Sequence, residues 1–286
     1  MSEGLDLTKL RAFVTVAEYL HFGRAADALH LTQPGLSRQI QTLERQLGVR
    51  LLERDQRNVS LTHAGRQLLE DAVPLLTAVQ ATRQRVARAA RGPRRLIVGF
   101  RAGVIPTSAI TTVSKLHPDL VVDVKRLEWD DQEQNLLSGS VDVAYVRRPI
   151  DDRGLRLIPL FEEPRLAALP RSHRLADAGE LLDRDLEAER HLRYLEPPAP
   201  GGTPIRSVEE KLEHVATGRG IILLPRSATQ HYTRPDVVYV PVIDAEPDQV
   251  WLAIVDGRDS IPVKDFVAAA TAAVARTEHA GAGSVA

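Results

Sequence analysis

Apolar residues in the first fifty positions recur with the period of helices. They stand three and four residues apart in Leu5–Leu20 and again in Leu36–Leu47. Between these runs, the alanine-rich segment Arg24–Leu29 favours a short helix that another helix can approach closely. Thr32 is placed to cap the following helix, and Gly48 is placed to end it. The pattern predicts three helices, the last two joined by a tight turn.

The polar face of the third predicted helix carries side chains that suit base recognition. Hydrogen-bonding groups gather at its N-terminus, where a helix-turn-helix presents the residues that read bases. Gln suits adenine and Arg suits guanine, each through two hydrogen bonds. The candidate DNA-binding residues in and before this helix are Arg24, Thr32, Gln33, Pro34, Ser37, Arg38 and Gln41. The alternative is a solvated polar face on an ordinary helical bundle.

Two short runs of β type follow this helix. They are Val49–Glu53 and Val59–Thr62, and the polar turn Asp55–Asn58 lies between them. The arrangement predicts a small hairpin, or wing, beside the recognition helix. Arg54 and Arg57 are expected to contact DNA there, at phosphates or in the minor groove. Solvated loop charge is an alternative of equal weight for both.

A long helix is predicted over residues 63–91. Its apolar positions alternate at spacings of four and three, which is typical of the seam between two paired helices. The seam comprises Leu61, Gly65, Leu68, Ala72, Leu75, Val79, Thr82, Val86 and Ala89. A second stripe of Leu69, Val73 and Leu76 leaves open the alternative that the helix packs on its own domain. The Gly-Pro pair within Arg91–Arg95 predicts a hinge.

From residue 96 onward, short apolar runs alternate with helical patterns. Strands are predicted at 96–100, 120–127, 142–146, 155–161, 165–169, 191–195, 221–224, 237–243 and 249–256. Helices are predicted at 105–117, 131–138, 207–217 and 262–276. This alternation indicates an α/β fold with a parallel sheet behind the N-terminal helical unit.

Composition narrows the functional classes. The chain has 286 residues, enough for two or three domains, and no cysteine, which excludes disulfides and thiolate metal sites. Residues 1–95 hold 15 Lys and Arg against 9 Asp and Glu, whereas residues 96–286 hold 22 against 29. A basic third before an acidic remainder suggests one DNA-facing module. Membrane spans, export signals, catalytic motifs and metal-ligand spacings are not found. We therefore expect a cytoplasmic protein that is not an enzyme and uses neither a cofactor nor a metal.

Ordered motifs between Leu5 and Gly65 resemble those of the LysR-type transcriptional regulators. They are FVTVAE, HFGRAADAL, TQPGLSRQIQTLE, LGVRLLER and VSLTHAG. Together they follow the family pattern with almost no gaps. The resemblance implies a winged helix-turn-helix DNA-binding domain at 5–62, a dimerising linker helix at 63–91 and an effector domain at 96–286. That domain is expected to have two α/β lobes like those of periplasmic binding proteins. Lobe I is placed at 96–162 and 256–280 and lobe II at 163–255, with chain crossings near Glu162–Arg165 and Val250–Asp256.

The resemblance also implies partners. They are double-stranded DNA with an interrupted inverted repeat, a small-molecule effector, and a second copy of the chain in a homodimer or homotetramer. RNA polymerase is a further candidate partner. Two other interpretations stay open: a DNA-binding regulator without a small-molecule effector, and a solute-binding module with an incidental N-terminal bundle.

Residues after the predicted strands are the candidates for effector contact, because open α/β sheets bind ligands at the carboxyl ends of their strands. They are Arg101, Gly103, Trp129, Arg147 and Glu196. In the family, positions matching Gly103 and Trp129 often carry a hydroxyl for an effector carboxylate, and here neither does. Arg101 and Arg147 are expected to hold an organic anion instead, such as a carboxylate, with Arg147 as the leading residue. The alternative is that both arginines pair with the acids at 128–131.

The segment EPPAPGGTPIR at 196–206 departs from the family pattern. It reads as a Pro- and Gly-rich loop, whereas the family usually has a helix there. One wall of the effector cleft and one contact between effector domains are therefore expected to differ from those of the family.

Overall fold

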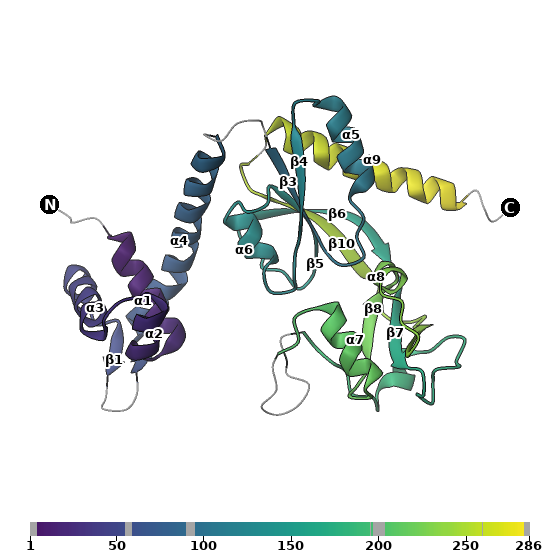
Figure 1. The fold of residues 1–286 in the computed structure, drawn as a ribbon, viewed down its shortest axis with the longest axis horizontal. Coiled ribbons are helices and arrows are strands. Elements are labelled where there is room, and N and C mark those ends of the chain that lie inside the picture. Colours follow the sequence, from purple (N-terminus) through teal and green to yellow (C-terminus); the bar gives the residue numbers. More distant parts are fainter. Residues whose placement is uncertain are drawn as a thin grey trace. The chain divides into compact units, whose positions relative to one another are not determined.

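The computed structural model describes residues 5–54, 59–89, 95–194, 196, 204–258 and 260–282 (Figure 1). Two compact units divide the chain, Met1–Arg83 and Gln84–Ala286, and each is described by itself. Within the described residues, no helix has the length and apolar character needed to cross a membrane.

The first unit is a three-helix domain with a short hairpin. Its elements are α1 (Leu7–Tyr19), α2 (Phe22–Ala28), α3 (Gln33–Leu47), β1 (Leu52–Arg54), β2 (Val59–Leu61) and most of α4 (His63–Ala89). Its core contains the predicted apolar faces, with Phe13, Leu36 and Ile40 fully buried. This order of elements confirms the predicted winged helix-turn-helix. α2 begins two residues earlier than predicted, because His21 Nδ1 accepts a hydrogen bond from Arg24 N and caps the helix.

The long helix α4 meets the core of the first unit with only part of its predicted seam. Leu68 packs on that core, and a Cβ at Gly65 would stand 2.1 Å from the Leu51 carbonyl oxygen. By contrast, Leu75 and Val86 are 45% and 66% exposed. The N-terminal half of α4 therefore packs on its own domain, so Gly65 and Leu68 do not belong to an open seam. Toward its C-terminal end, α4 presents an exposed apolar stripe that includes Leu75 and Val86.

A five-stranded sheet forms the first lobe of the second unit, in the order β4-β3-β5-β10-β6. Its strands are β3 (Arg95–Phe100), β4 (Val121–Arg126), β5 (Val143–Arg147), β6 (Leu155–Glu163) and β10 (Asp248–Val255). Its helices are α5 (Thr107–Leu116), α6 (Gln132–Leu137) and α9 (Ile261–Ala282). β3 pairs in parallel with β4 and β5, whereas β10 runs antiparallel to β5 and β6. Val113 of α5 and Phe266 of α9 share the core beside this sheet.

A three-stranded antiparallel sheet, in the order β8-β7-β9, forms the second lobe. Its elements are β7 (Arg165–Pro170), the 3₁₀ helix η1 (Asp183–Leu186), α7 (Val208–Ala216), β8 (Ile222–Pro225), α8 (Arg226–His231) and β9 (Val237–Pro241). The chain enters this lobe at Pro164, within the crossing predicted near Glu162–Arg165. The sequence pattern did not predict η1 or α8.

Two expectations for the second lobe are wrong. β10 belongs to the five-stranded sheet, because its apolar run fills the buried position between β5 and β6. The return crossing therefore lies in residues 242–247, and residues 248–255 move from lobe II to lobe I. The strand predicted at 191–195 is reduced to one bridge between His191 and Ile221, since Leu192 and Tyr194 pack in the cluster beneath α7 rather than in a sheet.

Candidate functional site

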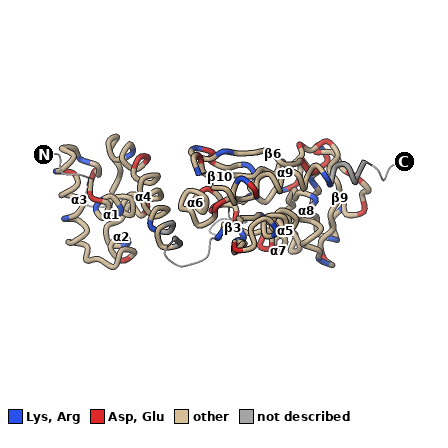
Figure 2. Tube along the Cα trace, turned by 90° about the horizontal axis from the view of Figure 1, so that it is seen from above, with Lys and Arg blue, Asp and Glu red and all other residues tan. Residues whose placement is uncertain are grey.

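The exposed face of α3 carries the predicted base-reading residues. Thr32 Oγ1 accepts a hydrogen bond from Gly35 N at 3.3 Å, which confirms Thr32 as the N-cap, and Gly48 ends the helix with φ +71°. The opposite face is buried in the core. Gln33, Pro34, Arg38 and Gln41 are exposed, and Ser37 is half-buried. The charged residues of α3 are Arg38, Glu44 and Arg45, so the helix carries both signs along its trace (Figure 2).

The wing is held to the recognition helix by a side chain that the pattern analysis did not single out. Glu44, near the end of α3, accepts hydrogen bonds at Oε1 from Leu51 N at 2.9 Å and Leu52 N at 3.2 Å. Thr62 Oγ1 donates to the Arg50 carbonyl at 2.8 Å and caps α4. These bonds fix where β1 and β2 stand relative to the exposed face of α3.

The three arginines predicted to contact DNA outside α3 differ in their positions in the structure. Arg24 donates from Nη2 to the Tyr19 carbonyl oxygen at 3.0 Å, so its guanidinium joins α1 to α2. Arg54 ends β1 opposite Val59, and Arg57 lies outside the described residues. DNA contact by these arginines stays a prediction.

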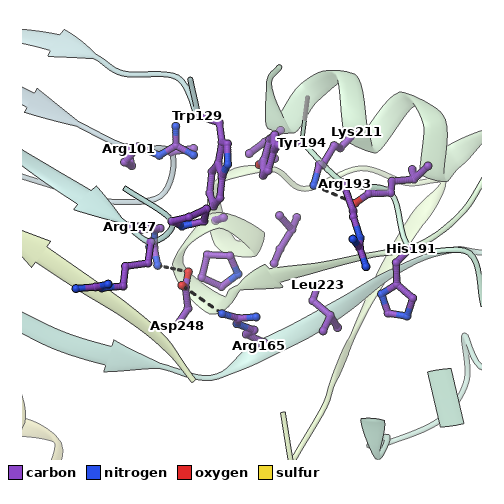
Figure 3. A pocket seen from close by; sticks show the side chains of 18 residues that line it. Arg101, Trp129, Arg147, Arg165, His191, Arg193, Tyr194, Lys211, Leu223 and Asp248 are labelled. Atoms are coloured by element: carbon purple, nitrogen blue, oxygen red, sulfur yellow. Dashed lines mark hydrogen bonds and ion pairs between the residues drawn. The ribbon is translucent and has the colours of Figure 1, made fainter. Parts of the chain in front are cut away.

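A cavity of about 490 Å³ opens between the two lobes of the second unit (Figure 3). Within the part of the chain that the structure describes, six basic side chains line it: Arg101, Arg147, Arg148, Arg165, Arg193 and Lys211. Asp248 is the one carboxylate in that lining, and it contacts Arg147 at 2.5 Å and Arg165 at 3.6 Å. The remaining excess of positive charge suits an anionic ligand.

Four side chains stack along one wall of this cavity. The rings of Trp129 and Tyr194 are parallel within 10°, with centroids 4.4 Å apart. The Arg101 guanidinium lies 4.8 Å from the Trp129 centroid, and Lys211 Nζ lies 3.5 Å from the Tyr194 centroid. Arg101 and Trp129 belong to the first lobe and Tyr194 and Lys211 to the second, so the stack joins the lobes (Figure 3).

Arg101 is a buried cation with unused hydrogen-bonding capacity. It is 4% exposed, and Nη1 donates to the Leu127 carbonyl at 3.2 Å. Its Nε has no hydrogen-bond partner among the described residues. Burial lowers the pKa of its guanidinium, because removal from water disfavours the charged form. Among the described residues, no carboxylate forms an ion pair with Arg101, so its charge at the cavity wall is not neutralised directly.

Arg147 is engaged by the protein itself. It lies within β5 rather than after it, and its guanidinium contacts Asp248 and Glu163 at 2.5 Å each and Ser227 Oγ at 3.2 Å. Glu163 also accepts a hydrogen bond from Ser227 N at 2.6 Å. Two carboxylates therefore neutralise Arg147 at the junction of the lobes, which removes the reason for placing it first among the ligand-binding cations.

Two other predicted effector residues do not line this cavity. Gly103 has φ +85°, and a Cβ there would stand 2.5 Å from Ala228 N, so the approach of the first lobe to α8 requires glycine. The Glu196 side chain is exposed and lies 3.9 Å from Arg193. Arg101 and Trp129 are the predicted residues that the cavity brings together, with Arg147 at its edge.

Two of the acids at 128–131 are paired with other arginines. Glu128 lies 3.1 Å from Arg126, and Asp130 contacts Arg206. No ion pair joins them to Arg101 or Arg147 among the described residues, and Glu128 and Asp131 act on the charge of Arg101 only at longer range. Lys211 was missed, although it stands on the apolar stripe of α7, where a lysine is unusual.

The matches to family models agree with this arrangement. The model of the bacterial regulatory helix-turn-helix protein, lysR family, covers residues 7–66, and the LysR substrate binding domain covers residues 102–275. The chain belongs to the LysR family. As a LysR-family member, it is a DNA-binding transcriptional regulator with an effector-binding domain.

Individual LysR-family proteins match along most of their length. The HTH-type transcriptional regulator BenM of Acinetobacter baylyi is 33% identical over 86% of this chain and 88% of its own length. The Hca operon transcriptional activator HcaR of Escherichia coli is 29% identical over 92% and 96%. The crystal structure of full-length BenM has a TM-score of 0.52, with 29% identity, and covers 96% of this chain and 98% of its own. CbnR in complex with its target DNA has a TM-score of 0.56 at 24% identity, over 95% of this chain and 99% of its own, which shows a likeness of fold alone.

Proposed function

We propose that this LysR-family protein binds an interrupted inverted repeat in double-stranded DNA and responds to a small organic anion held between its lobes. It does so in the cytoplasm, where a bacterial operator lies. The observation that carries the effector assignment is the cavity of about 490 Å³ lined by six basic side chains and one already paired carboxylate. The volume falls in the range of small-molecule sites.

For DNA, Gln33 and Arg38 at the start of α3 are proposed to read bases, and Arg54 to contact phosphate. Two copies of α3, related by two-fold symmetry, would read half-sites about one helical turn apart. The open stripe of α4, which includes Leu75, Val79 and Val86, supplies the apolar contact between the copies. RNA polymerase is proposed as a later partner of the DNA-bound oligomer.

For the effector, Arg101, Arg193 and Lys211 are proposed to hold the anionic group, and the Trp129 face to contact the rest of the molecule. A guanidinium suits a carboxylate because it offers paired donors in one plane. Arg101 has a donor without a partner, and Arg193 is largely exposed, so neither must break an internal buried ion pair.

Base preference tests the DNA assignment. Arg38→Ala and Gln33→Ala should lose roughly 1–3 kcal/mol of discrimination between the operator and mismatched sites. Arg54→Ala should weaken binding evenly on all sequences, because a phosphate contact carries no sequence information. Quantitative retardation assays on operator and random DNA would measure both. Equal losses on the two DNAs for all three variants would contradict these roles.

A thermal-shift panel tests the effector assignment. Acetate, succinate, benzoate and inorganic phosphate should include a stabilising anion, whereas choline and glycerol should not stabilise. An anion at about a hundredfold excess over its dissociation constant adds about 2.7 kcal/mol to the free energy of unfolding. Arg101→Gln should lose the response, and Arg148→Gln, at the exposed edge of the same cavity, should keep it. A panel without any response would favour a regulator whose lobes sense no small molecule.

A further inference from the structure

Lys211 occupies a position in α7 that belongs to the core. Val208, Leu212 and Val215 form the buried stripe of the helix, and Lys211 falls on the same face with 5% of its surface exposed. Its ammonium has two polar neighbours on the cavity wall. Nζ donates to the Leu192 carbonyl oxygen at 3.1 Å and lies over the Tyr194 ring (Figure 3). Among the described residues, no carboxylate forms an ion pair with it.

We propose that Lys211 binds the anionic group of the effector and takes up a proton as the effector enters. This inference rests on the proposed anion site. It goes further, because it assigns one residue to the ligand and makes binding depend on pH.

The surroundings of Lys211 oppose its charge in the empty cavity. Burial is the largest influence and lowers the pKa of Lys211 to about 7. Arg101, across the stack, lowers it further, and Glu196 raises it from a distance. The Tyr194 ring face and the Leu192 carbonyl favour the ammonium, but neither carries a net charge.

The other elements around Lys211 add little compensation. β7 and β9, which pack against α7, contribute apolar residues such as Ala168 and Val237. On the loop that carries Tyr194, His191 and Arg193 also line the cavity and can only add positive charge. Near neutral pH, the empty site therefore holds Lys211 partly as the neutral amine.

An anion in the cavity reverses this balance. A negative group beside Nζ favours the ammonium and raises the pKa of Lys211 in the complex. Between the pKa values of the free and bound states, each binding event takes up as much as one proton, and affinity falls up to tenfold per pH unit. Below about pH 6 the lysine is already charged in both states, so binding there should take up no proton through Lys211.

Lysine side-chain NMR tests the empty site directly. The chain has five lysines, Lys9, Lys115, Lys125, Lys211 and Lys264, so ¹³Cε signals can be assigned by the loss of one peak in Lys211→Met. The expected result is that the signal missing from Lys211→Met titrates near neutral pH, well below the ordinary lysine value of about 10. If Lys211 titrates together with the exposed lysines, the inference is overturned.

Calorimetry of binding tests the coupling. Acetate and benzoate would be titrated into the full-length protein at about pH 8 and about pH 6, in pairs of buffers with different ionisation enthalpies. Wild type should take up close to one proton at the higher pH and almost none at the lower. Lys211→Arg, which keeps a permanent charge, should bind without uptake and with little pH dependence. Lys211→Met should bind at least tenfold more weakly at about pH 6, where wild type is fully charged.

The outcomes separate the two proposals. Binding by wild type without proton uptake at the higher pH, or equal affinity of Lys211→Met at the lower pH, overturns the role of Lys211 and leaves the anion site standing. Failure of both anions to bind overturns both. Urea denaturation of each variant checks that its effector domain is folded.

Discussion

Buried charges at the crossing between the lobes have a structural role that the sequence pattern concealed. Arg147 Nη2 contacts Glu163, at the end of β6, and Nη1 contacts Asp248, at the start of β10. These two carboxylates stand where the chain leaves and re-enters the first lobe. The arginine therefore holds together the two segments that connect the lobes.

Removing this arginine should destabilise the protein more than removing its neighbour. Arg147→Met leaves Glu163 and Asp248 buried without their shared cation, which should cost about 3–5 kcal/mol of unfolding free energy. Arg148→Met removes a largely exposed arginine from the same cavity and should cost less than about 1 kcal/mol. Urea denaturation measures both. Equal midpoints for the two variants would show that the network contributes no stability.

Lys211 should make stability depend on pH in a direction that can be stated in advance. Its pKa is about 7 in the folded state and 10.5 in the reference state, so the unfolded chain binds more protons between these values. Stability from this group therefore rises as pH increases from about 7 to about 10. Lys211→Met lacks this contribution, so the melting temperature of wild type minus that of the variant should increase over that window. A difference that stays flat, or falls, would contradict the lowered pKa.

Residues on regular faces could be predicted from the sequence, and residues whose roles depend on distant partners could not. The period of α3 fixes which side chains leave the core, so Gln33, Arg38 and Gln41 were identified correctly as exposed. Arg147 was misjudged because Asp248 is 101 residues away in the chain. For Lys211, the sequence shows a lysine on an apolar stripe, but only the fold shows that a cavity lies beside it.

At the scale of elements, α4 divides into a part that serves its own domain and a part that is open. Leu68 and Leu76 pack on the winged domain, whereas Leu75 is 45% exposed. Substituting glutamate at both Leu75 and Val79 should yield monomers that fail on paired half-sites, because buried apolar contacts between helices would be replaced by like charges. Val73→Glu is the control, since two residues turn the helix by about 200° and place it across from Leu75. Sedimentation of the three proteins measures the effect, and a dimeric double variant would remove the stripe from the interface.

The strands of the effector domain illustrate what local pattern can decide. Apolar runs located every strand of both sheets, from β3 to β10. They could not assign β10 to its sheet, because its neighbours β5 and β6 lie far back in the chain. The run at 191–195 does not form a strand, because Leu192 and Tyr194 pack against α7. Its backbone pairs with the rest of the lobe at one bridge, between His191 and Ile221.

At the scale of the whole effector domain, ion pairs as well as the aromatic stack join the lobes. Arg126 of β4 forms two hydrogen bonds with Glu209 of α7, at 2.8 and 2.9 Å. Hydrogen bonding to Arg126 lowers the pKa of Glu209 to about 2. Because that pKa lies below its ordinary value, the contribution of this pair is present at neutral pH and is lost as pH falls from about 4.5 towards about 2.

Removing the Arg126–Glu209 pair should lower anion affinity, although neither residue lines the cavity. Glu209→Gln should lower anion affinity severalfold, because the open arrangement of the lobes competes with binding. The double variant Arg126→Glu with Glu209→Arg should restore most of the affinity. Glu213→Gln is the control, since Glu213 pairs with Arg234 inside the second lobe. Unchanged affinity in Glu209→Gln would show that the lobes stay together without this pair.

The close approach of Gly65 to Leu51 links the long helix α4 to the DNA-binding domain. The start of α4, the wing and the end of α3 are linked by that contact and by hydrogen bonds of Thr62 and Glu44. A change in the direction of the start of α4 would therefore reorient the recognition helix α3 as well. If two copies bind paired half-sites as we propose, the half-site spacing that they accept would follow the angle between their α4 helices, whereas the bases read within each half-site would not change.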